Sequence, residues 1–163
     1  MHNFLIALGS NRRHHRFGRP QAVLRAALAA MEDAGITVRE VSPTVLTAPI
    51  GPSLCRYANG ATLIETRFGP DKLLETLKKI EGGFGRRTGG QRWTSRVLDL
   101  DIVLWDGGAY AGPGLTIPHI LFRQRDFVLR PAVEIAPDWR DPITNLTVRQ
   151  LTARLTTPRP LSR

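Results

Sequence analysis

The sequence has one cysteine, Cys55, in 163 residues, so no internal disulfide can form and no oxidising compartment is required. No apolar run approaches the roughly 20 residues that a membrane-spanning helix needs. The first residues, MHNFLIALGSN, lack the basic region and the long apolar segment of a signal peptide, and they predict an early strand instead. These absences exclude a disulfide scaffold, and we expect a cytoplasmic protein.

A GxxxxGK[ST] string is also missing, which excludes the phosphate-binding loop of P-loop nucleotide enzymes. If the protein binds ATP, arginines and a metal ion must neutralise the phosphates instead. Repeats, linkers and low-complexity stretches are absent, so we expect residues 1–163 to form a single domain. With 42% apolar and 23% charged residues, the chain can bury an adequate core.

Acidic residues are outnumbered, because 14 Asp and Glu stand against 23 Lys and Arg, which gives a formal net charge of +9. Such a surface attracts polyanions, either nucleic acid or nucleotide phosphates. Two clusters hold much of the arginine: Arg12, Arg13, Arg16 and Arg19, and then Arg86, Arg87, Arg92 and Arg96. We interpret the first cluster as a solvated basic surface, whereas the second lies in a glycine-rich loop that leads to two aspartates.

Hydrophobic periodicity and turn residues predict alternating strands and helices. The expected strands cover residues 4–8, 36–46 with an interruption at Pro43, 57–67 and 98–105. The expected helices begin at Pro20, at Pro70, near Leu121 and after Thr147, which is a favourable N-cap. The order β-α-β-β-α-β predicts an α+β fold: a ferredoxin-like antiparallel sheet with the helices on one face, as a single pair of layers.

The string LDLDIVLW, on the last of these strands, carries the strongest chemical signal. Alternate residues of a strand share a face, so Asp99 and Asp101 are expected to point the same way, ~6–7 Å apart. Leu100, Ile102 and Leu104 are expected to point the other way, into the core. Two neighbouring carboxylates repel, and a Mg²⁺ ion between them would remove that cost. The alternative is that they pair with arginines of the preceding loop, and the two interpretations are compatible.

That loop, residues 84–97, combines three glycines with four arginines and little apolar content. Glycine hinges with Arg86, Arg87, Arg92, Trp93 and Arg96 could close it over a triphosphate and exclude water. The alternative is a disordered basic loop, which would not explain why Asp99 follows three residues after Arg96. We therefore favour a functional loop.

Together these segments resemble the 6-hydroxymethyl-7,8-dihydropterin pyrophosphokinase family nearly from end to end. The similar segments are ALGSN (7–11), TAPIGP (47–52), YANGA (57–61), IEGGFGR (80–86), RWTSRVLDLDIVLW (92–105), TIPH (116–119) and RDFVLRPAVEIAP (125–137). The string R-W-x-x-R-x-L-D-L-D-I is specific, and the weaker motifs support it through their order and spacing.

The resemblance implies that the protein transfers pyrophosphate from ATP, its co-substrate, to the hydroxymethyl group of the pterin and releases AMP, in folate biosynthesis. It implies two Mg²⁺ ions on Asp99 and Asp101, with Arg86 and Arg96 aiding catalysis. The implied pterin residues are Thr47, Ile50, Tyr57, Asn59, Trp93 and Phe127, the two rings of Tyr57 and Phe127 enclosing the heterocycle. The implied ATP residues are Glu81, Arg92, Ile102, Thr116, His119 and Arg125. On this basis we expect a monomer that acts on small molecules and binds neither nucleic acid nor membranes.

Three positions depart from the family pattern. Arg86-Arg87-Thr88 replaces Arg-x-Arg, Gly114 stands where a basic residue is common, and Ile120 follows the histidine where an aromatic is frequent. These departures concern ATP affinity and loop behaviour rather than the reaction.

Two other functions fit parts of the sequence. An RNA-binding module would suit a basic ferredoxin-like sheet, but an RNP-like aromatic string is missing and paired aspartates repel phosphates. A non-catalytic descendant could keep only the pocket, but the intact Asp99, Asp101, Arg86 and Arg96 argue against it. Taken alone, His119, Tyr57 and Asn59 would be interpreted as structural residues.

Overall fold

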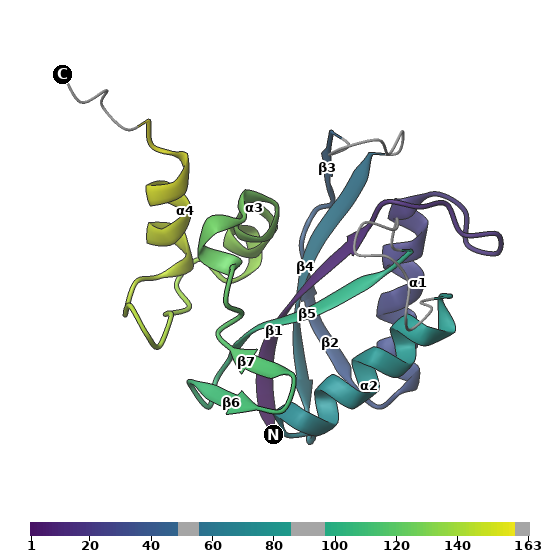
Figure 1. Ribbon diagram of the computed structural model, residues 1–163, viewed down its shortest axis with the longest axis horizontal. Helices are drawn as coiled ribbons and strands as arrows, with labels where there is room; N and C mark the ends of the chain where they lie inside the picture. Colours follow the sequence, from purple (N-terminus) through teal and green to yellow (C-terminus); the bar gives the residue numbers. More distant parts are fainter. Residues whose placement is uncertain (49–55, 86–96, 159–163) are drawn as a thin grey trace.

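The computed structural model describes residues 1–48, 56–85 and 97–158 (Figure 1). Its strands are β1 (His2–Ser10), β2 (Thr37–Val41), β3 (Val45–Thr47), β4 (Tyr57–Thr66), β5 (Asp99–Trp105), β6 (Tyr110–Gly112) and β7 (Leu115–Ile117). Its helices are α1 (Pro20–Asp33), α2 (Pro70–Gly83), the 3₁₀ helix η1 (Phe122–Gln124), α3 (Asp126–Ile135) and α4 (Val148–Thr156). In the described ranges, no helix is long and apolar enough to cross a lipid bilayer.

The main sheet has the strand order β2-β4-β1-β5, and β3 also pairs with β4. Every pairing is antiparallel, which confirms the predicted ferredoxin-like α+β arrangement. The expected interruption at Pro43 separates β2 from β3. Because β1 lies between β4 and β5, residues near its carboxyl end have neighbours on both sides.

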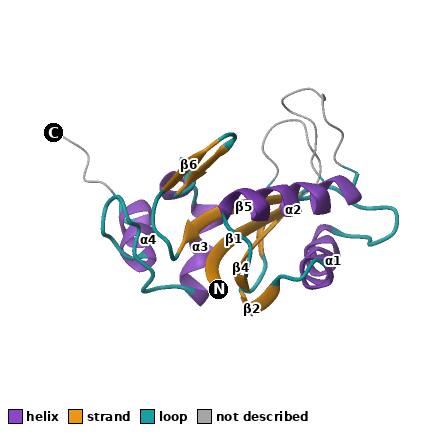
Figure 2. Ribbon diagram, turned by 90° about the horizontal axis from the view of Figure 1, so that it is seen from below, coloured by secondary structure: helices purple, strands orange, loops and turns teal. Residues whose placement is uncertain are grey.

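Helices cover both faces of the sheet, which differs from the single helical layer expected from the sequence. Figures 1 and 2 show α1 and α2 on one side and α3 and α4 on the other. The first core packs α1 and α2 on alternate β1 residues such as Phe4, Ile6 and Leu8. The second core packs α3 and α4 on the opposite side, where Leu5 and Ala7 point. The second layer matters because α3 begins beside the candidate site.

A β-bulge in β5 corrects one side-chain assignment. Ile102 pairs with Ile6 and Leu104 pairs with Leu5, so Val103 is an extra residue in the ladder. Leu100 and Ile102 lie in the first core as predicted, but Leu104 lies in the second core with Val103. The extra residue shifts the alternation, because two successive side chains then occupy one face.

Several element boundaries follow the predicted signals. Proline opens α1 and α2, and Thr147 caps α4 through a capping box with Gln150. The helix expected near Leu121 begins instead at Asp126, after the single turn of η1. The short β6–β7 hairpin was not predicted, since three-residue strands leave little periodicity to detect.

Candidate active site

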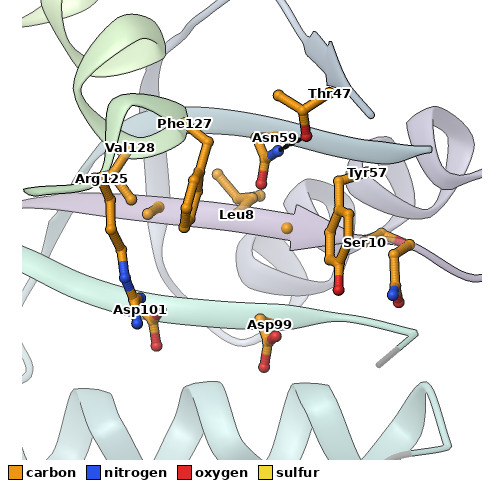
Figure 3. Close-up of a pocket in the computed structure, with 13 residues that line it drawn as sticks. Leu8, Ser10, Thr47, Tyr57, Asn59, Asp99, Asp101, Arg125, Phe127 and Val128 are labelled. Atoms are coloured by element: carbon orange, nitrogen blue, oxygen red, sulfur yellow. Dashed lines mark hydrogen bonds between the residues drawn. The ribbon is translucent and has the colours of Figure 1, made fainter. Parts of the chain in front are cut away.

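A cavity of about 320 Å³ (pocket 1) lies where the carboxyl end of β1 meets the start of α3 (Figure 3). It is lined by Ala7, Leu8, Gly9, Ser10, Asn11, Thr47, Tyr57, Asn59, Asp99, Asp101, Arg125, Phe127 and Val128. The four described residues predicted to bind the pterin are all in this set, together with both aspartates. Residues from four strands and from α3 therefore converge in one cavity.

Strand pairing explains how the cavity forms. Gly9 of β1 pairs with Asn59 on one side and with Asp99 on the other, and Ala7 pairs with Asp101. A Cβ atom on Gly9 would stand 3.4 Å from Asn59 Oδ1, so a side chain there would lie in van der Waals contact with that amide. The small residues of β1 thus form the base of the cavity, with the Asn59 amide on one side and the carboxylates of Asp99 and Asp101 on the other.

The walls of pocket 1 combine two aromatic rings with a fixed amide. Figure 3 shows Tyr57 and Phe127 pointing into the cavity from β4 and α3, with Asn59 between them. Asn59 is 6% exposed, and its Nδ2 donates a 3.3 Å hydrogen bond to Thr47 Oγ1. The Arg125 guanidinium lies 5.6 Å from the ring centroid of Phe127, within range of a cation–π contact. This arrangement suits a flat, polar-edged heterocycle.

A second cavity of about 360 Å³ (pocket 2) adjoins the first at Asp101. It is lined by Leu74, Leu100, Asp101, Ile102, Gly112, Gly114, Leu115, Thr116, His119 and Ile120. Three of the predicted ATP residues are here: Ile102, Thr116 and His119. Asp101 is shared, so its carboxylate stands between the two cavities.

Two other predicted ATP residues have different positions. Arg125 lines pocket 1 rather than pocket 2. Glu81 is 3% exposed, and its Oε1 accepts a 2.8 Å hydrogen bond from the backbone N–H of Leu100, between the two aspartates in sequence. Glu81 therefore braces the strand that carries the acids.

His119 is held next to Asp101 by backbone contacts. Its N–H donates to the carbonyl of Val103 at 3.0 Å, and its Nδ1 accepts from the N–H of Leu121 at 3.2 Å. Nε2 lies 4.0 Å from Asp101 Oδ2. Burial lowers the pKa of His119, Asp101 opposes that shift and Arg125 adds to it. A neutral imidazole with Nδ1 accepting carries its proton on Nε2, facing the carboxylate.

The two aspartates fit a magnesium site completed by substrate. Both side chains line pocket 1, and the Asp101 side chain is 44% exposed. Among the described residues, no group of three or more His, Cys, Asp or Glu could hold a metal ion on its own. Mg²⁺ is typically bound through one or two carboxylates, with phosphate oxygens and waters filling the other positions. Hard oxygen donors beside two open pockets meet that requirement.

Five predicted site residues lie outside the described ranges: Ile50, Arg86, Arg92, Trp93 and Arg96. The structure adds Ser10 and Asn11, which line pocket 1 and for which the sequence alone predicts no role. Asn11 is 3% exposed, and its Oδ1 has no hydrogen-bond partner in the part of the chain that is described. The signal for both was the turn string GSN directly after a buried strand.

The basic stretch after GSN forms a fixed turn. His14 and Gly18 exchange two backbone hydrogen bonds, and buried His14 accepts from the N–H groups of Arg16 and Phe17 through Nδ1. The Phe17 ring stacks on Phe84 at 5.0 Å between centroids. The arginines of this stretch are exposed, as the solvated-surface interpretation predicts.

Comparisons with known proteins place the chain in a family. Residues 5–137 match the model of 7,8-dihydro-6-hydroxymethylpterin-pyrophosphokinase (HPPK). The 2-amino-4-hydroxy-6-hydroxymethyldihydropteridine pyrophosphokinase of Synechocystis is 36% identical over 151 residues, covering 92% of this chain and 74% of that protein. The protein of the same name from Pseudomonas aeruginosa is 38% identical over 139 residues, covering 84% and 82%.

Solved structures with a similar fold are also found. A wild-type HPPK-DHPS chain of Plasmodium falciparum superposes with a TM-score of 0.71 at 12% identity, over 94% of this chain. The present chain spans 44% of that longer protein, so this likeness concerns the fold of one part. The family match covers most of the sequence, and the matches to the curated relatives extend over most of their own length. The chain belongs to the 7,8-dihydro-6-hydroxymethylpterin-pyrophosphokinase family.

Proposed function

We propose that the junction of the two pockets is the place where this chain transfers the terminal pyrophosphate of ATP to the hydroxymethyl group of 6-hydroxymethyl-7,8-dihydropterin, releasing AMP, in folate biosynthesis. The observation that carries the proposal is the shared position of Asp101 in pocket 1 and pocket 2. An acceptor in one cavity and a donor in the other would meet beside the same carboxylate.

Pocket 1 is the proposed pterin site. The rings of Tyr57 and Phe127 stack on the two faces of the heterocycle, and Asn59 bonds to its polar edge. The hydrogen bond to Thr47 fixes the orientation of the Asn59 amide, leaving Oδ1 to accept from the pterin. Ile50 and Trp93 remain proposed members of this site on the strength of the sequence pattern.

Pocket 2 is the proposed ATP site. Ile102, Thr116 and His119 line it, and the Nε2–H of neutral His119 can donate to a phosphate oxygen near Asp101. Arg125 supplies positive charge from the pocket 1 side, close enough to affect the pKa of His119. Glu81 keeps β5 in place. Arg86, Arg92 and Arg96 are proposed to neutralise the phosphates, on the strength of the sequence pattern.

Asp99 and Asp101 would hold two Mg²⁺ ions. Such ions neutralise phosphate charge and orient the attacking and leaving oxygens of an in-line transfer. The contribution of the chain is to fix both carboxylates on one strand face, at the end of β1 where the base of the cavity is open. The hydroxymethyl oxygen loses its proton to water as it attacks the β-phosphorus of ATP, and the bond from that phosphorus to the α,β-bridging oxygen breaks, its electron pair leaving with AMP.

We also propose that the protein acts in the cytoplasm as a monomer on small molecules, without nucleic-acid or membrane partners. The paired carboxylates argue against RNA binding alone, because a phosphate backbone laid over that sheet edge would meet two negative charges.

The test is release of AMP from ATP by the purified chain, measured with and without Mg²⁺ and with and without the pterin. We expect AMP only when metal and pterin are both present. AMP release at the same rate with and without the pterin would contradict the pterin as the proposed acceptor. A folded protein that binds pterin without releasing AMP would instead be a non-catalytic descendant.

A further inference from the structure

The segment from His119 to Phe127 supplies residues to both pockets. His119 lines pocket 2, and Arg125 and Phe127 line pocket 1. Ile120, Leu121 and the short turn of η1 lie between them, and a 3₁₀ turn of three residues has few hydrogen bonds, of poorer geometry than those of an α-helix. Something outside the segment must therefore set the relative positions of these side chains.

The middle of this segment is tied to a residue far along the chain. Arg123, in η1, donates to Asp141 from Nε at 2.6 Å and from Nη2 at 2.8 Å. Asp141 also accepts from the backbone N–H of Ile143 at 3.0 Å and from Thr144 Oγ1 at 2.6 Å. A carboxylate has about four acceptor positions, so these four donors occupy them fully. The paired guanidinium has one geometry, because the fork binds both oxygens at once.

The Asp141 side of this ion pair is shielded from water. The Asp141 side chain is 0% exposed and the Arg123 side chain 27%. Burial alone would raise the pKa of Asp141, but the hydrogen bonds from Arg123, Thr144 and the backbone of Ile143 lower it to about 2. The carboxylate is thus charged whenever the protein is folded near neutral pH.

The partner of Arg123 belongs to the region that follows the family match. That match ends at residue 137, and Asp141 lies in the connection from α3 to α4. α4 packs against both α3 and η1, and the Arg123 guanidinium also lies 4.8 Å from the ring centroid of fully buried Phe122. The C-terminal region therefore holds the segment that serves both pockets.

We propose that Arg123 and Asp141 are positioning residues for the reaction: their ion pair fixes η1 so that His119 in pocket 2 and Arg125 and Phe127 in pocket 1 keep their relative places. The inference rests on the proposed function for its kinetic consequences. The structural part of the inference, that the Asp141 carboxylate orders the segment from His119 to Phe127, concerns the folded chain itself.

The test compares Arg123→Lys and Asp141→Asn with Leu151→Ala in the full chain. Lysine keeps the charge but loses the bidentate fork, and the amide introduced by Asp141→Asn keeps the shape of the side chain but loses the charge. Leu151 is 6% exposed in α4, so its truncation weakens the same module without touching the ion pair. The measurements are the thermal midpoint, the NMR resonances of His119 and Phe127 without substrates, and KM and kcat for both substrates.

We expect both ion-pair variants to displace or broaden the His119 and Phe127 resonances and to raise KM for pterin and for ATP about tenfold or more. Leu151→Ala should lower the thermal midpoint with KM and the resonances close to wild type. Unchanged resonances in the ion-pair variants, or changes equal to those of Leu151→Ala, would overturn the inference. If the wild-type chain released no AMP, the proposed function would fail, whereas the resonances would still decide the positioning role.

Discussion

Asp101 Oδ2 lies 4.0 Å from Nε2 of His119 at the boundary between two cavities. The carboxylate comes from β5, and the backbone N–H of His119 donates to the carbonyl of Val103, two residues farther along the same strand. β5 thus sets the positions of both Asp101 and His119, and changes in β5 are expected to affect the binding of both substrates.

Removal of either paired acid should stop turnover without unfolding the protein. We expect Asp99→Ala and Asp101→Asn to lower kcat by about three orders of magnitude, since metal ions contribute several kcal/mol to such transfers. The thermal midpoint of Asp101→Asn should stay or rise slightly, because two like charges no longer face each other. Asp106→Asn is the matched control: this aspartate follows the same strand but bonds to Asn3 outside both pockets. AMP release near wild-type levels in Asp101→Asn would sink the metal assignment.

The ring of Tyr57, rather than its hydroxyl, should contribute to pterin binding. Stacking of a base on an aromatic side chain is worth about 1–3 kcal/mol, so Tyr57→Ala should raise KM for the pterin about 5- to 150-fold. Tyr57→Phe keeps the ring and should stay within about twofold of wild type. KM for ATP should change little in either variant. Equal loss in both variants would show that the hydroxyl, not stacking, does the binding.

Lys78 of α2 should contribute to ATP binding. Its Nζ lies 4.0 Å from the place where a Cβ on Gly114 would stand, and Gly114 lines pocket 2. We expect Lys78→Gln to raise KM for ATP about fivefold, which corresponds to about 1 kcal/mol for an exposed charge. Lys79→Gln is the control, since Lys79 pairs with Glu75 instead. An effect of equal size in both variants would indicate only a general loss of positive charge.

Acid should destabilise the wild-type chain partly through Asp141. Its pKa is about 2 in the folded protein against a usual 3.8, so its stabilising effect is present above pH 4 and is lost as the pH falls toward 2. That effect amounts to about 2 kcal/mol. Urea unfolding of wild type and Asp141→Asn at pH 6, 4 and 2.5 should show a gap in unfolding free energy that narrows with acid. A gap independent of pH would contradict the lowered pKa.

Local pattern was enough to predict much of the fold and part of the site. Prolines at the starts of α1 and α2 and the Thr147 cap act within one turn, so their effects are visible in sequence. The common face of Asp99 and Asp101 also follows from two-residue alternation in a single strand.

Features that depend on pairing partners were not predictable. The bulge at Val103 exists only relative to β1, so the face of Leu104 was predicted wrongly. The cover provided by α3 and α4 depends on which sheet face remains open after α1 and α2 pack. The Arg123–Asp141 pair joins residues 18 positions apart on either side of α3, with no periodic signal to link them.

The extra residue in β5 has a consequence for anyone who moves this site to another scaffold. Val103 stands outside the regular register with β1, and its carbonyl is the acceptor that anchors His119. The distance from the His119 imidazole to Asp101 therefore depends on the extra backbone residue in β5 rather than on a particular side chain. Grafting the letters D-L-D and a histidine onto a regular strand would copy the functional groups without their spacing; the irregularity would have to be transplanted too.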